Sequence, residues 1–196
     1  HIVPDHVPDE SAVFVEPLAA AFRLLEQVKV SPGQKWLVVG DGRLGQLVAR
    51  VLALQGVELT VLGRHDRKLE LLEKLGIRTT RGLDQMISAG ENSGDFDFAV
   101  DCAGNSSGFD LARRSLRPQG TLLLKSTYAG ALNLDASACV VDEITILGSR
   151  CGPFQPAIEA LASGSIDPRD LIDEEFALES GMRAFQRASE KGVMKV

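Results

Sequence analysis

Hydrophobic residues recur along the chain with two spacings, one typical of buried strands and the other of amphipathic helices. Apolar runs that suit strands lie at 36–39, 58–62, 77–80, 96–100, 120–125 and 143–147. Helical spacing is found at 17–27, 44–52, 66–75, 108–116, 154–162 and 178–189, while 83–89 is at most a short helix and 90–94 a loop. Strands that alternate with helices predict an α/β fold with a parallel six-stranded sheet, right-handed crossovers and helices on both faces.

The first fifteen residues lack this alternation. Pro4 and Pro8 disfavour helix in the residues before them, and the chain does not open with methionine. We therefore expect residues 1–10 to be extended, residues 1–15 to be a linker within a longer protein, and residues 16–196 to form the folded domain.

A Gly-x-Gly-x-x-Gly turn joins the first strand to its helix. In a dinucleotide fingerprint the first glycine allows a tight turn, the second admits a pyrophosphate to the backbone, and the third packs the helix on the strand. The pyrophosphate then binds the free amides of the helix N-terminus. The motif predicts a doubly wound Rossmann fold, and its alternative is a glycine-rich turn that serves packing alone. The candidate cofactor-binding residues here are Gly40, Asp41, Gly42, Arg43, Leu44 and Gly45.

The end of the second strand indicates which dinucleotide binds. An acid that would accept the ribose 2′-hydroxyl of NAD is expected where Gly63 stands, and Arg64 follows it. Arg64 offers a planar set of donors for a 2′-phosphate, with His65 and Lys68 close by. We therefore expect NADP in preference to NAD, and an aspartate at Gly63 combined with Arg64→Ala to reverse that preference. The alternative is a basic, solvated start of a helix.

Composition limits the possible partners. The chain of 196 residues has 21 basic and 27 acidic residues and a net charge of −6, which argues against a nucleic-acid or anionic-membrane surface. No apolar run reaches the roughly 18 residues that a membrane span requires. Cys102, Cys139 and Cys151 are widely spaced and odd in number, which favours a reducing cytoplasm over a disulfide framework. A small-molecule substrate is therefore expected.

Three stretches together resemble the cofactor-binding domain of the medium-chain dehydrogenase/reductase superfamily. They are Glu16–Ala21, Ser31–Gly45 and Lys68–Gly76, and the variant looks closest to zinc-dependent alcohol, polyol and threonine dehydrogenases. The resemblance implies NAD(P)-dependent oxidation of an alcohol or reduction of a carbonyl. The zinc-bearing, GroES-like catalytic domain of that superfamily has no counterpart in this sequence. We therefore expect the chain alone to bind a dinucleotide without turning over substrate.

The resemblance also assigns roles to individual residues. Glu16 corresponds to a glutamate that can ligate the catalytic zinc, although an acid at a helix N-terminus is also favoured by the helix dipole. Arg150 resembles a residue at the subunit contact or near the cofactor. The loop residues beside the cofactor are Cys102, Ala103 and Gly104, and those that flank the nicotinamide are Ser126 and Thr127, followed by Tyr128.

Two alternatives to a zinc-dependent dehydrogenase remain open. One is a zinc-free quinone or enoyl reductase of the same superfamily, and the other is a non-catalytic sensor of dinucleotides. Asn105 and Ser106 lie in the loop that follows the fourth predicted strand, and they are candidates either for the cleft or for caps of the next helix. An apolar last strand at the sheet edge predicts a homodimer through residues 144–150.

Overall fold

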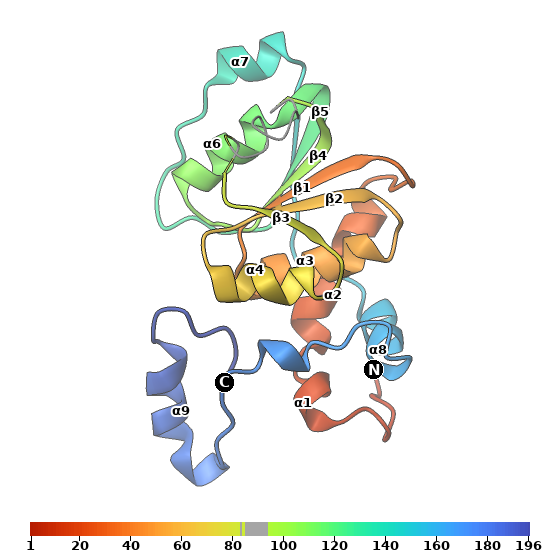
Figure 1. The fold of residues 1–196 in the computed structure, drawn as a ribbon, viewed down its shortest axis with the longest axis vertical. Coiled ribbons are helices and arrows are strands. Elements are labelled where there is room, and N and C mark those ends of the chain that lie inside the picture. Colours follow the sequence, from red (N-terminus) through yellow and green to blue (C-terminus); the bar gives the residue numbers. More distant parts are fainter. Residues whose placement is uncertain (83, 85–93) are drawn as a thin grey trace.

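A parallel sheet organises the chain, as expected for the α/β class (Figure 1). The computed structural model describes residues 1–82, 84 and 94–196. Within these residues the sheet has six strands in the order β3-β2-β1-β4-β5-β6. Their bounds are Lys35–Val39 (β1), Glu58–Leu62 (β2), Arg78–Thr80 (β3), Phe96–Asp101 (β4), Leu116–Leu124 (β5) and Thr145–Gly148 (β6). This is the Rossmann order, and the direction of winding reverses between β1 and β4, where such sheets bind their ligands.

Helices cover both faces of the sheet (Figure 1). On one face, α2 (Val15–Gln27), α3 (Arg43–Ala53) and α8 (Phe154–Ala162) enclose the larger core, which includes the strand residues Trp36 and Val38. On the other, α6 (Ser106–Arg114) covers Leu37 and Val39. Successive strand side chains point to opposite faces. The continuous apolar runs of the sequence are therefore explained by a sheet buried on both sides.

The N-terminal segment packs more closely than the sequence predicts. Helix α1 (Asp9–Ala12) starts directly after Pro8, so the expectation of extended structure through residue 10 is wrong at its end. Proline is tolerated there because its missing N–H would have no helical partner. Phe14 is 0% exposed and belongs to the larger core. Part of the expected linker therefore contributes to the fold of the domain.

The remaining differences are shifted element ends and one additional helix. Strand β5 begins at Leu116, within the predicted helix, because Leu116 pairs with Phe96 before a register shift. Helix α7 (Ala136–Val141), which was not predicted, is capped by Asp135, whose side chain accepts from Ala138 N–H. The predicted helix 178–189 is instead a 3₁₀ turn η2 (Leu178–Ser180) followed by α9 (Gly181–Ala188). Residues 83 and 85–93, where a short helix and a loop were predicted, lie outside the described residues.

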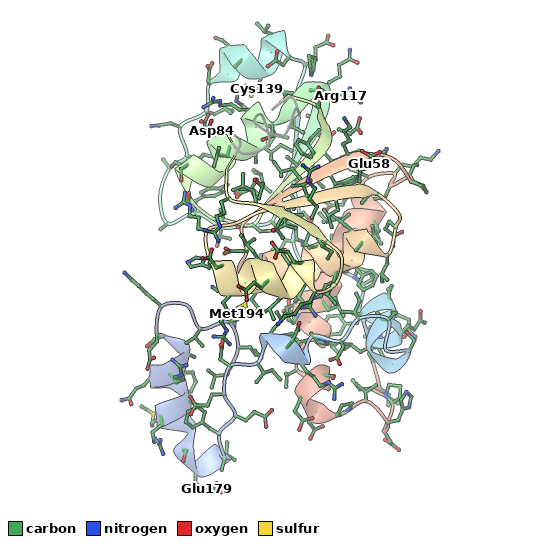
Figure 2. All side chains as sticks on the ribbon, viewed as in Figure 1. Glu58, Asp84, Arg117, Cys139, Glu179 and Met194 are labelled. Carbon is green, nitrogen blue, oxygen red and sulfur yellow. The ribbon has the colours of Figure 1, made fainter. Side chains whose placement is uncertain are left out.

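The C-terminal segment returns to the body of the domain. Buried Arg50 of α3 binds Asp170 of η1 (Arg169–Leu171) at 2.8 Å, and Arg67 of α4 (Asp66–Glu73) binds Asp173 at 2.8 Å. Met194 is buried close to α4 (Figure 2). No helix among the described residues is both long and apolar enough to span a bilayer.

Candidate cofactor-binding site

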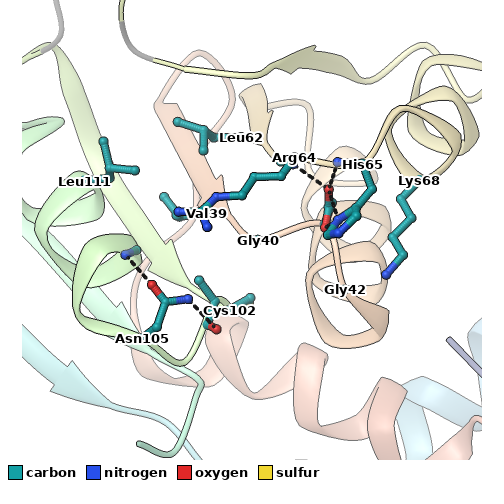
Figure 3. Close-up of a pocket in the computed structure, with 14 residues that line it drawn as sticks. Val39, Gly40, Gly42, Leu62, Arg64, His65, Lys68, Cys102, Asn105 and Leu111 are labelled. Carbon is teal, nitrogen blue, oxygen red and sulfur yellow. Dashed lines mark hydrogen bonds and ion pairs between the residues drawn. The ribbon is translucent and has the colours of Figure 1, made fainter. Parts of the chain in front are cut away.

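A pocket of about 260 Å³ lies at the carboxyl ends of β1, β2 and β4 (Figure 3). We call it the strand-end pocket. Residues from the loop before α3, the start of α4 and the start of α6 line it. The residues predicted from sequence that line it are Gly40, Asp41, Gly42, Gly63, Arg64, His65, Lys68, Cys102 and Ala103. The structure thus brings together three loops that are far apart in sequence.

The floor of the pocket is built from backbone in close contact. A Cβ at Gly45 would lie 1.9 Å from the carbonyl oxygen of Gly40, so only glycine lets α3 pack this closely. Gly40 itself has φ +116°, and a Cβ there would lie 2.8 Å from the backbone of Cys102. These contacts fix the N-terminus of α3 against the ends of β1 and β4.

Gly42 has different surroundings. Its φ is −72°, which any residue adopts, and a Cβ there would meet no atom within 4 Å. Packing within the described chain therefore gives no reason for glycine at this position. The open space lies above the free amides at the start of α3, where an anion is favoured.

Asp41 reaches from this turn to the end of β2. Its Oδ2 accepts hydrogen bonds from the backbone N–H groups of Arg64 and His65, both at 2.7 Å (Figure 3). Its Oδ1 lies 2.9 Å from Nδ1 of His65. Burial tends to raise the pKa of Asp41, but the hydrogen bonds from His65 and Arg64 outweigh it and hold the pKa below its usual range. The carboxylate is therefore ionised at neutral pH.

The position of Asp41 corrects one expectation about Gly63. A Cβ at Gly63 would lie 2.6 Å from both Cβ and Oδ2 of Asp41. An aspartate at Gly63 alone thus has no room and would face an existing carboxylate. The carboxylate of Asp41 fills the space beside Gly63 and already faces the N–H groups of Arg64 and His65 and the ring of His65.

Arg64 extends across the strand-end pocket (Figure 3). Its guanidinium donates to Oγ of Ser107 at the start of α6, at 3.2 Å. This contact uses one of the five N–H donors of the side chain. Lys68 lies on the first turn of α4 in the same pocket. Both cations line the pocket next to the end of β2.

The other predicted residues lie outside the lining of the pocket. Arg43, Leu44 and Gly45 form the first turn of α3 beneath it. A Cβ at Gly104 would lie 3.3 Å from the carbonyl of Thr127 and 3.4 Å from Cβ of Ser126, so the loops after β4 and β5 are adjacent. Arg150 is exposed beyond β6, and Glu16 is exposed in the first turn of α2.

Two half-buried residues, Cys102 in the pocket lining and Tyr128 in the loop after β5, have raised side-chain pKa values. Burial raises the pKa of the Cys102 thiol, so this residue is a thiol and not a nucleophilic thiolate at neutral pH. Tyr128 donates a hydrogen bond to Asp101, and burial together with this bond raises the pKa of Tyr128. Both side chains therefore stay neutral at neutral pH.

Sequence reasoning missed the contribution of α6 to the pocket. Gly108 and Leu111 line it, and so does Asn105, which was predicted as a possible cap. Asn105 is the N-cap of α6 and accepts from Gly108 N–H at 2.9 Å, which confirms that alternative. The apolar spacing of 108–116 indicated a helix, but nothing in it showed that Leu111 faces the ends of β1 and β2.

The described residues offer no cluster of three or more His, Cys, Asp or Glu side chains that could hold a metal ion. Glu16 belongs to no such group. Its role as a zinc ligand stays a prediction, and we derive no chemical step from a metal. The strand-end pocket, in contrast, fits a dinucleotide, because it combines an open helix N-terminus with cations at the end of β2.

Strand order and the glycine-lined pocket define a Rossmann domain. Residues 44–163 match the model of the zinc-binding dehydrogenase family, and the chain belongs to that family. This confirms the resemblance seen in the sequence.

Two proteins that are similar to the chain in sequence are polyol dehydrogenases. D-arabinitol dehydrogenase 1 of Uromyces fabae is 26% identical over 97% of this chain, and sorbitol dehydrogenase of Mus musculus is 28% identical over 97%. The alignments span 58% and 56% of those proteins, so the chain covers little more than half their length.

Solved structures share the fold. L-idonate 5-dehydrogenase of Escherichia coli superposes with a TM-score of 0.88 at 22% identity, over 97% of this chain and 57% of that one. A putative zinc-binding dehydrogenase of Sinorhizobium meliloti, solved with NADP bound, has a TM-score of 0.86 at 20% identity, over 97% and 59%.

Proposed function

We propose that this chain is the dinucleotide-binding domain of a zinc-dependent, alcohol dehydrogenase-like oxidoreductase, which transfers hydride between NADP(H) and a small alcohol or carbonyl substrate. The observation that carries the proposal is the open space over Gly42 at the switch point of the sheet. When bound, the nicotinamide supplies the hydride acceptor or donor. Family membership and the polyol dehydrogenase relatives support the substrate class.

The residues of this chain bind and orient the cofactor. The amides at the start of α3 hydrogen-bond the pyrophosphate, and Gly42 lets it approach the backbone. Arg64 leaves Ser107 and donates to the 2′-phosphate, with Lys68 as a second cation. Asp41 holds the Arg64–His65 backbone at the end of β2, so these side chains start from a fixed position.

In the full-length protein, a bound zinc would supply a Lewis acid for the substrate oxygen, and Glu16 would be the one ligand that this chain contributes. The cysteines Cys102, Cys139 and Cys151 are free, which supports a cytoplasmic location.

We further propose that the protein is a homodimer. Strand β6 pairs with β5 and ends the sheet, so its outer edge has backbone groups available to a second copy. Sedimentation at about 100 µM tests this, because a contact of roughly −6 kcal/mol is populated at that concentration. A strictly monomeric mass would contradict it.

Titration calorimetry with NADP and NAD tests the cofactor assignment. Wild type should bind NADP more tightly. Arg64→Ala should weaken NADP roughly ten- to hundredfold, as expected for loss of about 1.5–3 kcal/mol of charge-assisted hydrogen bonding, and should hardly affect NAD. The difference should shrink with added salt, since these ion pairs are near solvent.

Arg114→Ala is the matched control. Arg114 is an exposed arginine on α6 that pairs with Asp110 at 3.5 Å and does not line the pocket. It should leave both affinities as in wild type. Preference of the wild type for NAD, or equal weakening of both cofactors by Arg64→Ala, would refute the assignment of Arg64.

A further inference from the structure

His65 is held in a defined tautomer. The ionised carboxylate of Asp41 only accepts hydrogen bonds, and it lies 2.9 Å from Nδ1 of the imidazole. Nδ1 must therefore carry a proton in every state in which this contact exists. In the neutral ring the other nitrogen, Nε2, is then an acceptor, and in the protonated ring it is a donor.

Nε2 is the ring atom left for a ligand. Among the described residues it has no hydrogen-bond partner, and the side chain of His65 is 58% exposed while lining the strand-end pocket. The end of β2 is where Rossmann domains bind the adenosine ribose. The two dinucleotides differ at this point alone: NAD has a 2′-hydroxyl that donates, and NADP a 2′-phosphate that accepts.

We propose that His65 is a proton-linked specificity residue: neutral, it accepts from the 2′-hydroxyl of NAD, and protonated, it donates to the 2′-phosphate of NADP. This rests on the proposed function, namely that the pocket binds a dinucleotide. When the free ring is neutral, NADP binding takes one proton from solvent onto His65 and NADP release returns it, so the uptake is at most one proton. NAD binding has no such proton uptake.

Charged groups of both signs surround His65. The carboxylate of Asp41 contacts the ring, and several cations lie close by. Part of that cationic charge is neutralised, because Asp173 pairs with Arg67 at 2.8 Å and Glu174 pairs with Arg187 at 3.0 Å. In the strand-end pocket the charged groups beside His65 are Asp41, Arg64 and Lys68. His65 and Lys68 also line a second pocket, of about 240 Å³, whose other charged groups are Arg67, Asp173, Arg187 and Lys191.

The direction of the pH effect follows from linkage. A proton taken up on binding makes the affinity for NADP fall as pH rises, by at most about tenfold per pH unit. The 2′-phosphate has its own titration near pH 6 and acts in the opposite direction. A variant that cannot titrate at residue 65 isolates the contribution of the histidine, since the phosphate is the same in both measurements.

The experiment compares wild type with His65→Gln. Affinities for NADP and NAD are measured from pH 6 to pH 8, and proton uptake at pH 7 is measured by calorimetry in two buffers of different ionisation enthalpy. From pH 6 to pH 8 the NADP:NAD affinity ratio should fall about tenfold or more in wild type relative to His65→Gln. Wild type should take up more protons with NADP than the variant.

Two further variants sharpen the test. His6→Gln is the matched control, because His6 lies near the carbonyl of Ala162 and lines neither pocket that contains His65; it should behave as wild type. Asp41→Asn removes the charge and keeps an acceptor oxygen. In this variant the fall of the NADP:NAD affinity ratio with rising pH should occur at lower pH than in wild type. A merely structural role of Asp41 would not shift it.

The outcomes separate this inference from the proposed function. Equal pH dependence of the ratio in wild type and His65→Gln would overturn the role of His65 while leaving dinucleotide binding intact. If wild type binds neither dinucleotide, the proposed function itself fails. A ratio that changes with pH only when residue 65 is histidine supports the inference.

Discussion

The loops at the end of the sheet and the C-terminal segment are built in opposite ways. At the sheet end, backbone atoms touch backbone atoms, as between Gly40 and Gly45, and the Asp41 carboxylate has three donors. In the C-terminal segment, α9 stands apart from the sheet (Figure 1), and Leu178 just before it is 92% exposed. Phe185 on α9 is 77% exposed.

This difference shows where the sequence is constrained. At the sheet end, single atoms decide which residues fit, since contacts under 3 Å leave no room for a methyl group. The C-terminal segment is attached by a few buried side chains, Leu171 and Met194 among them, and by the ion pair of Asp173 with Arg67, while the apolar side chains at α9 stay exposed. Substitutions in the two regions should therefore have very different effects.

The largest expected effect is that of Gly45→Ala. Its Cβ would lie 1.9 Å from the Gly40 carbonyl oxygen, so α3 must move away from β1. We expect a loss of about 3 kcal/mol or more in unfolding free energy, measured by urea denaturation. Gly42→Ala, with no atom within 4 Å of the new Cβ, should keep wild-type stability and lose dinucleotide affinity. Equal stability of the two variants would contradict the packing argument.

Gly63→Asp should come next. The new side chain meets Asp41 at 2.6 Å and adds a second carboxylate, so we expect a loss of about 1–3 kcal/mol. The double variant Asp41→Gly/Gly63→Asp removes the Asp41 side chain and places a carboxylate at the end of β2. It should therefore regain most of the unfolding free energy that Gly63→Asp loses. Additive effects of the two substitutions in thermal unfolding would show that they do not share one space.

The glycine variants at positions 45 and 63 show which features of the fold and the site could be predicted from the sequence. The glycine spacing and the alternation of apolar runs were sufficient for the fold, because both periods are local. The contact of Asp41 with Arg64 and His65 was not predictable, since it joins loops more than twenty residues apart. The same holds for Leu111, whose place in the pocket depends on how α6 packs, and for Phe14, whose burial depends on the assembly of the larger core.

Lowering the pH should show how much the ionised carboxylate of Asp41 contributes to the unfolding free energy. Its pKa is depressed in the folded state relative to about 3.9 in an unfolded chain, so its stabilisation is present above that value and is lost as pH falls through the folded pKa. Between pH 5 and pH 2, wild type should lose roughly 1 kcal/mol more unfolding free energy than Asp41→Asn, as expected for hydrogen bonds to a charged group. Parallel pH profiles in urea denaturation would contradict this.

The smallest effects should come from the exposed apolar side chains of the C-terminal segment. Leu178→Ser and Phe185→Ser remove groups that already face solvent, so each should change the unfolding free energy by less than about 0.5 kcal/mol. Leu171→Ala is the matched comparison, because Leu171 in η1 is 0% exposed and its truncation should cost about 2–5 kcal/mol. A large destabilisation by either serine variant in urea denaturation would mean that α9 is part of the folded core. In that case the contrast between the two regions would not hold.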